Sequence, residues 1–149
     1  TNELMGHELK QPINFGPQHH YVLQAAIAGL HAWVRTGEAP PRAARLETDD
    51  GQPPSFHLDE HGIAKGGVRT PWVDVPVART SGVGDDATPV ALLFGSGEPF
   101  DEATRGRLYP GGKSEYLERF TESLDATIRA GYLVRADRAE ILELAAATY

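Results

Sequence analysis

The residues between Gly16 and Gly37 constrain the fold more than any other part of the chain. Pro17 suits the first turn of a helix, where its missing N–H costs nothing. Gly37 favours a left-handed helix end, and Pro40-Pro41 prevent a restart. Between these limits, apolar residues recur at steps of three and four, namely Val22, Leu23, Ala26, Ile27, Leu30, Trp33 and Val34. This spacing predicts an amphipathic helix with one face buried, either internally or against another chain.

The last third of the chain also has a helical period. A short helix is predicted from Asp101 to about residue 109, where Pro110-Gly111-Gly112 ends it. A longer helix is predicted over residues 114–130, with Gly131 as its stop. The pattern Asp137-x-x-Glu140 resembles a capping box and predicts the start of a final helix. The side chains expected to be buried are Tyr116, Leu117, Phe120, Leu124, Ile128, Ile141, Leu142 and Leu144.

The middle of the chain, residues 42–93, lacks this period and predicts strands and loops. A short strand is expected at residues 45–47, and residues 55–58 and 63–65 flank the turn Asp59-Glu60-His61-Gly62 as a hairpin. Alternation over residues 73–77 predicts an edge strand or an extended loop because of Pro76. We expect residues 1–15 to form an irregular arm and residues 80–89 a polar, disordered loop.

These patterns predict one unit of residues 1–149 with a mixed α/β fold, helices at both ends and a loop-rich β-hairpin middle. Its expected parts are an arm plus helix (1–37), a hairpin and loop segment (38–98) and a helical segment (99–149).

Composition excludes several classes of function. The formal net charge of −7 and the scattered basic residues argue against a nucleic-acid partner, which needs a basic face. No apolar stretch reaches the length of a membrane span, and no signal peptide is visible, so we expect a soluble protein without a membrane partner. With no cysteine, the chain has no disulfide, no thiolate catalysis and no cysteine-based zinc site.

His19 and His20 are the candidate catalytic residues. Both lie in the first turn of the predicted helix, where the helix dipole disfavours protonation and favours a ring that can accept a proton. The alternative is that one ring is packed and hydrogen-bonded while the other faces water.

No metal or other cofactor is expected. His31 shares a helix face with His20, but three turns separate them by about 16 Å, so one ion cannot bind both. His57 and His61 flank the proposed hairpin without a known zinc spacing. The acidic pairs lie in predicted turns. Ser96, between two glycines, is better explained by a tight turn than by a nucleophile.

The segment Arg69-Thr70-Pro71-Trp72-Val73-Asp74 holds three candidate substrate contacts, namely Arg69, Trp72 and Asp74. Clefts commonly combine a few polar groups with apolar ones. The competing interpretation is a brace, in which Arg69 pairs with Asp74 and Trp72 packs on the helices of this chain. We favour the brace because Pro71 and Pro76 stiffen the segment.

Several motifs together resemble the C-terminal region of a bacterial α/β-hydrolase-domain family. They are Pro12-Ile13-Asn14, residues 16–22, residues 33–37, residues 66–76, Pro99-Phe100-Asp101 and Gly131-Tyr132-Leu133. The resemblance implies hydrolysis of a small ester-like substrate and a serine nucleophile that precedes this region. No Gly-x-Ser-x-Gly turn occurs in the sequence.

The resemblance implies the C-terminal part of an esterase-like enzyme that supplies pocket or cap structure and is inactive alone. The first helix would then pack on a sheet from the missing N-terminal part, and the isolated chain would tend to self-associate. The alternatives are a stand-alone structural or interaction domain without catalysis, and a small enzyme that uses His20 and Asp74.

Overall fold

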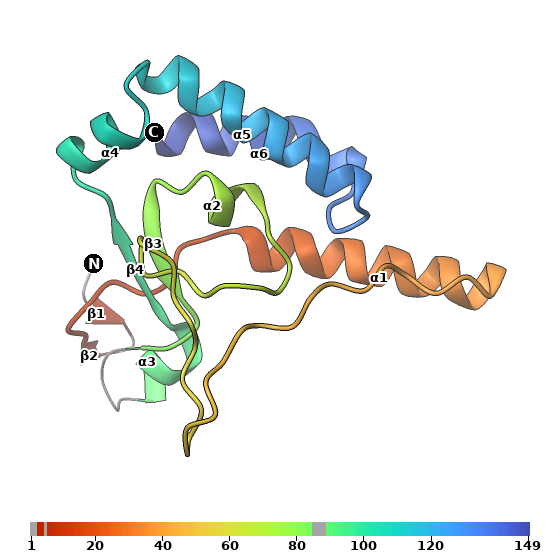
Figure 1. Ribbon diagram of the computed structural model, residues 1–149, viewed down its shortest axis with the longest axis horizontal. Helices are drawn as coiled ribbons and strands as arrows, with labels where there is room; N and C mark the ends of the chain where they lie inside the picture. Colours follow the sequence, from red (N-terminus) through yellow and green to blue (C-terminus); the bar gives the residue numbers. More distant parts are fainter. Residues whose placement is uncertain (1–2, 5, 85–88) are drawn as a thin grey trace. The chain divides into compact units, whose positions relative to one another are not determined.

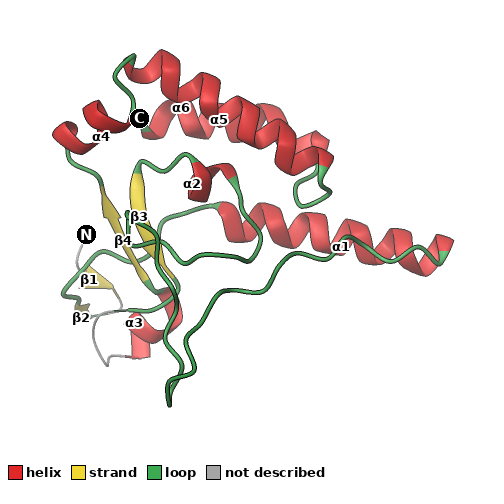
Figure 2. Cartoon of the chain, in the orientation of Figure 1, coloured by secondary structure: helices red, strands yellow, loops and turns green. Residues whose placement is uncertain are grey.

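A computed structural model of the chain describes residues 3–4, 6–84 and 89–149 (Figure 1). The fold is mixed α/β and divides into two compact units that interleave along the sequence. Unit 1 comprises Thr1–Gly16, Leu46–Lys65 and Ala78–Asp101, and unit 2 comprises Pro17–Arg45, Gly66–Val77 and Glu102–Tyr149. The long helices, red in Figure 2, belong to unit 2, and the strands, yellow in Figure 2, belong to unit 1.

The first predicted helix is confirmed as α1, Gln18–Thr36. Gly37 adopts the left-handed conformation, with φ of 78°, and its N–H donates to the Trp33 carbonyl. Only Tyr21 and Ala25 are buried in this helix. Most of its apolar stripe is therefore not buried within this chain, and burial against another chain, the alternative that the sequence left open, stays a prediction. Leu23, Ile27, Leu30, Trp33 and Val34 are between 47% and 80% exposed.

The helices α4 (Glu102–Leu108), α5 (Gly112–Arg129) and α6 (Arg138–Thr148) confirm the helical pattern of the last third. A short 3₁₀ turn, η1 (Arg135–Asp137), precedes α6. The predicted start of the final helix is confirmed, since Asp137 is the N-cap residue of α6. The capping box itself does not form, because Asp137 already has helical backbone angles and its side chain makes no capping hydrogen bond. Gly131, with φ of 84°, follows the C-terminus of α5 as predicted.

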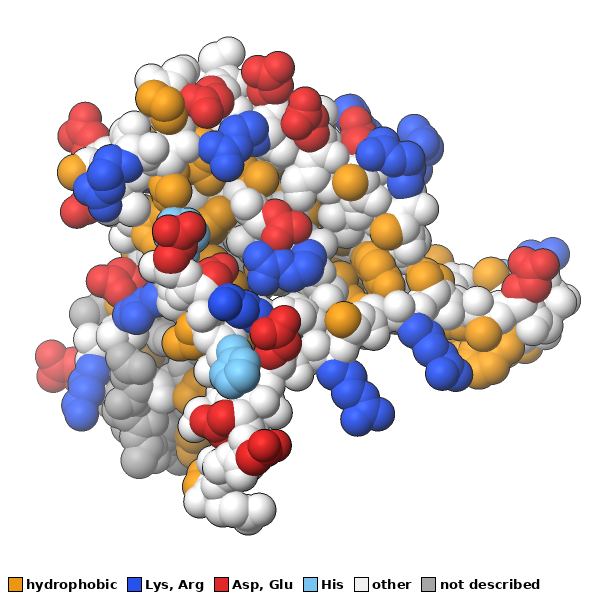
Figure 3. All heavy atoms as spheres, in the orientation of Figure 1, with side chains coloured by type: hydrophobic (Ala, Val, Ile, Leu, Met, Phe, Trp, Pro, Cys, Tyr) orange, Lys and Arg blue, Asp and Glu red, His pale blue; other side chains and the backbone are white. Residues whose placement is uncertain are grey.

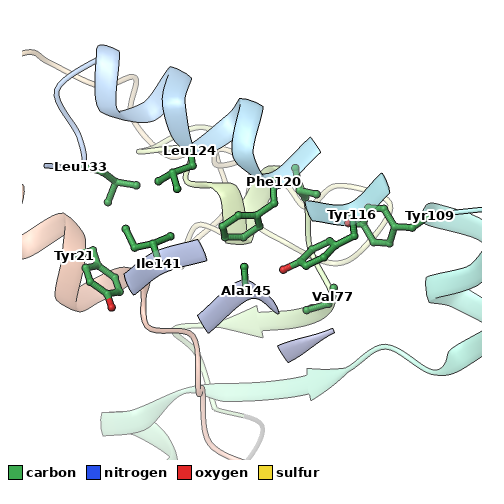
Figure 4. Close-up of a cluster of buried hydrophobic side chains, with 10 residues drawn as sticks. Tyr21, Val77, Tyr109, Tyr116, Phe120, Leu124, Leu133, Ile141 and Ala145 are labelled. Carbon is green, nitrogen blue, oxygen red and sulfur yellow. The ribbon is translucent and has the colours of Figure 1, made fainter. Parts of the chain in front are cut away.

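The core of unit 2 forms where α5 faces α6 (Figure 4). Tyr116, Phe120 and Leu124 lie one turn apart along α5 and are fully buried, as are Ile141 and Ala145 of α6. Four of the eight positions predicted to be buried are confirmed, three are partly buried and pack against this core, and Leu144 is 37% exposed. Tyr109 is buried beside this cluster and donates its hydroxyl to the Pro76 carbonyl at 2.8 Å. Burial raises the pKa of the Tyr109 hydroxyl to about 12.

Residues 73–77 were predicted to be an edge strand or an extended loop, and no strand forms there: residues 73–74 are helical and residues 75–77 are loop. Instead, a single helical turn, α2 (Pro71–Asp74), lies in this segment. Pro71 at the first helical position supplies the backbone angle that a helix start requires, and the N–H of Val75 donates to the Pro71 carbonyl. The alternation of valines therefore reflects burial of Val75 and Val77 rather than a strand.

Unit 1 contains short strands that pair antiparallel. β3 (Ala78–Ser81) pairs with β4 (Ser96–Pro99), and β1 (Glu3–Leu4) pairs with β2 (His7–Glu8). Three of these findings correct the sequence analysis: residues 1–15 are not wholly irregular, residues 80–81 are strand rather than loop, and Ser96 begins a strand rather than a tight turn. The predicted loop ends where α3, Pro89–Phe94, begins. Residues 85–88 of that loop lie outside the described residues.

The hairpin predicted in the middle of the chain is present as a narrow ladder. Leu58 pairs with Ala64 across a turn in which Gly62 has φ of 76°, and Thr48 pairs with Phe56 on the other side. Backbone hydrogen bonds link His57 to both Glu47 and Lys65. The segment predicted as a strand at residues 45–47 therefore joins the hairpin as its third chain segment. None of the described helices is long and apolar enough to cross a membrane.

An ion pair between α5 and α6 predicts how stability depends on pH. Arg138 donates to both carboxylate oxygens of Asp125, at 2.6 and 3.0 Å. These hydrogen bonds, aided by the charges of Arg138, Arg129 and Arg135, lower the pKa of Asp125. A carboxyl whose pKa is lowered by folding stabilises the fold above its unfolded pKa and loses that contribution as the pH falls.

We therefore expect Asp125→Asn to melt at a lower temperature than the parent chain at pH 7. This difference in melting temperature should disappear as the pH falls below about 4. Circular dichroism melts at pH 7, 5, 4 and 3 would measure the difference. Glu118→Gln removes an exposed carboxylate from the same helix and should leave the melting temperature unchanged. An Asp125→Asn deficit that is equally large at pH 7 and pH 3 would contradict the expectation.

Candidate functional site

Unit 2 contains an open hollow of about 500 Å³ beside the C-terminal half of α5. One wall is formed by one face of α5, and the opposite side by the loop that follows α1 and by the segment leading into α2. The residues that line it are Arg42, Ala43, Ala44, Gly67, Arg69, Asp74, Ser123, Ala126, Thr127, Ala130 and Tyr132. Its volume lies within the range of small-molecule sites in proteins, about 300–1,000 Å³.

Arg69 and Asp74 meet at this hollow. The guanidinium Nε of Arg69 donates to Asp74 Oδ1 at 2.7 Å, and the two side chains are 34% and 41% exposed. The Thr127 hydroxyl contacts the backbone carbonyls of Ser123 and Arg69, at 2.8 and 3.3 Å. The segment before α2 is thus fixed to α5 at this point. The pairing that the sequence predicted is present, and its two members line the hollow.

Trp72 lies away from the hollow and packs on the helices of its own unit. Its ring stacks on Tyr21 of α1, with centroids 5.7 Å apart and planes 7° from parallel. The ring of Phe120 in α5 meets the Trp72 ring in a T-shaped arrangement, with ring centroids 5.6 Å apart. This is the packing expected of the brace interpretation.

His19 and His20 lie at the start of α1 and are exposed. The ring of His20 contacts the side-chain amide of Gln24, one turn farther along, and meets the edge of the Tyr21 ring at 5.0 Å. Neither histidine lines the hollow. The structure therefore brings Arg69 and Asp74 together but does not join them with the histidine candidates.

The remaining candidate groups have structural partners. Ser96 is 9% exposed, and its hydroxyl donates to the Val83 carbonyl at 3.0 Å. The Nδ1 atom of His57 lies 3.9 Å from Oε2 of Glu47, and the Nε2 atom of His61 lies 3.9 Å from Oε1 of Glu60. Among the described residues, no group of three or more histidines and carboxylates could hold a metal ion.

Most of the residues that line the hollow were not predicted from the sequence. Ser123, Thr127 and Ala130 recur at steps of four and three, so a helical projection of α5 would have placed them on one face. That face is polar or small, in contrast to the aromatic face that forms the core. Arg42 and Tyr132 lie in loops, and no periodic signal marks them.

Comparison with known protein families identifies the family of this chain. The family model described as an alpha/beta hydrolase domain matches residues 2–143, which is nearly the entire chain. The chain therefore belongs to the alpha/beta hydrolase domain family. No curated protein and no solved structure gave a match.

Proposed function

We propose that the chain forms the C-terminal part of an esterase-like enzyme of the serine-hydrolase type, in which it supplies pocket or cap structure. The observation that carries the proposal is the family match over residues 2–143. Enzymes of this fold use a serine on a sharp turn after a strand, with the sequence Gly-x-Ser-x-Gly. The sequence has no such turn. In the proposal, another segment of the enzyme provides the nucleophile.

The exposed face of α1 supports this proposal. Hydrophobic side chains gather on this helix in Figure 3. Leu23, Ile27, Leu30 and Val34 follow steps of four, three and four, which place them in one stripe along the helix. Apart from its histidines, the helix has one side chain that is charged at neutral pH, Arg35. A helix of this composition is normally covered, and we propose that the sheet bearing the nucleophile covers it.

The hollow in unit 2 supports a role in forming a pocket. Arg69 and Asp74 fix each other at its rim, so their positions do not depend on a ligand. Ser123 and Tyr132 add hydroxyl groups to walls in which four alanines and Gly67 leave much of the surface apolar. Small-molecule sites commonly have this combination of a few polar groups among apolar ones.

Labelling with a fluorophosphonate, which reacts with activated serines, tests the proposal. The 149-residue chain should show no stoichiometric labelling and should hydrolyse aryl esters no faster than background, because the covalent step needs an activated nucleophile. The complete gene product should be labelled at a serine outside these residues. Tandem mass spectrometry of the labelled peptide would identify that serine.

Ser96→Ala in the complete gene product serves as the matched control and should leave labelling unchanged. Labelling of Ser96 itself would overturn the proposal by placing the nucleophile in this chain. A complete gene product that is neither labelled nor active on esters would favour a structural domain without catalysis.

A further inference from the structure

The hollow of unit 2 carries one more cationic than anionic side chain. Arg42, Arg69 and Asp74 line it, and the Nε of Arg69 is committed to Asp74. Arg42 is exposed, and within the described part of the chain its guanidinium makes no hydrogen bond or ion pair. A guanidinium without a partner presents two parallel N–H donors, which match the two oxygens of a carboxylate.

The walls of the hollow suit an organic ligand rather than an inorganic ion. Alanines contribute from both sides, Ala43 and Ala44 from the loop after α1, and Ala126 and Ala130 from α5. Tyr132 adds an aromatic ring. Small side chains leave the volume of about 500 Å³ free, and their methyl groups favour an apolar ligand body.

We propose that this hollow binds an organic monocarboxylate. Arg42 binds the carboxylate and the apolar body lies along the alanines beside α5, while Arg69 and Asp74 form an ion pair, neutral as a whole, at the rim. The excess of a single positive charge matches a monoanion better than a phosphate dianion. The inference deepens the proposed function, on which its biological role rests, because ester hydrolysis releases a carboxylic acid.

Titration of the 149-residue chain with 4-phenylbutyrate tests the binding without any need for catalysis. The readout is the shift of backbone amide signals in ¹⁵N-correlated NMR spectra. The largest shifts are expected at Gly67, Ala126, Thr127 and Ala130, which line the hollow. The neutral amide 4-phenylbutyramide has the same body and should bind roughly tenfold more weakly, because it cannot form the charge-assisted hydrogen bonds.

Arg42→Met should weaken 4-phenylbutyrate binding roughly tenfold and leave the amide unaffected. Arg45→Met is the matched control, because Arg45 is an exposed arginine three residues farther along that does not line the hollow. Ala126→Leu, at an exposed helix position, should abolish binding of both compounds by filling the hollow.

Equal affinities for the acid and the amide, equal effects of Arg42→Met and Arg45→Met, or shifts confined to other residues would each overturn the inference. These failures are distinguishable from failure of the proposed function. Binding is measured on this chain alone, whereas the hydrolase proposal depends on a labelled serine elsewhere in the gene product.

Discussion

Replacing Phe120 with alanine should lower the free energy of unfolding by about 4 kcal/mol, as for large-to-small substitutions of buried aromatics. Phe120 is 0% exposed and lies at the centre of the unit 2 core. Its ring packs against the rings of Tyr116 on its own helix and Trp72 of α2, with ring centroids 5.5 and 5.6 Å away, respectively. Alanine would leave a cavity between α5 and α2 that these rings cannot close without moving. Urea denaturation followed by circular dichroism would measure the loss.

Phe120→Leu is the matched control, since it keeps most of the volume and should cost about 1 kcal/mol. If Phe120→Ala and Phe120→Leu had the same urea-denaturation midpoint as the parent chain, Phe120 would not lie in a packed core. A large and equal loss for both variants would also contradict the cavity argument, because it would assign the effect to ring contacts alone.

The helices could be predicted from the sequence because their signals are local. Pro17 and Gly37 mark the ends of α1 to within a residue, and Gly131 marks the end of α5. The aromatic stripe of α5 also identified the core, since Tyr116, Phe120 and Leu124 recur at steps of four. In each case the determining interactions lie within one or two helical turns.

The segments that could not be predicted depend on partners distant in sequence. β3 and β4 contain Arg79 and Glu98, whose ion pair at 2.8 Å joins residues 19 positions apart. Neither strand shows a clear alternation. The helical turn of α2 was not predicted, because the alternating valines around Pro76 favoured an edge strand or an extended loop, whereas Pro71 starts a helical turn.

The candidate site was likewise predictable only where its interactions are local in sequence. The pair of Arg69 and Asp74 was predictable, because two opposite charges five positions apart lie at the ends of a stiff segment. The hollow beside the pair was not, since it depends on how the loop carrying Arg42 lies against α5. The exposure of α1 is likewise a tertiary property, because its amphipathic pattern predicts a covered face without specifying what covers it.

Replacing Trp72 with alanine should lower the free energy of unfolding by about 3 kcal/mol, at the low end for large aromatics because the ring is only partly buried. Trp72 lies between Tyr21 of α1 and Phe120 of α5, so its loss removes contacts to two helices. A tryptophan that merely lined a substrate cleft could be removed with almost no effect on stability. Chemical denaturation followed by circular dichroism would measure the change without relying on tryptophan fluorescence.

Trp33→Ala provides the matched control, because the chain has two tryptophans and Trp33 is 47% exposed on α1. Its removal should change the free energy of unfolding by less than about 1 kcal/mol, since little buried area is lost. A denaturation midpoint of Trp72→Ala equal to that of the parent chain would refute the brace. A loss for Trp33→Ala as large as that for Trp72→Ala would instead show that the exposed face of α1 is covered in solution.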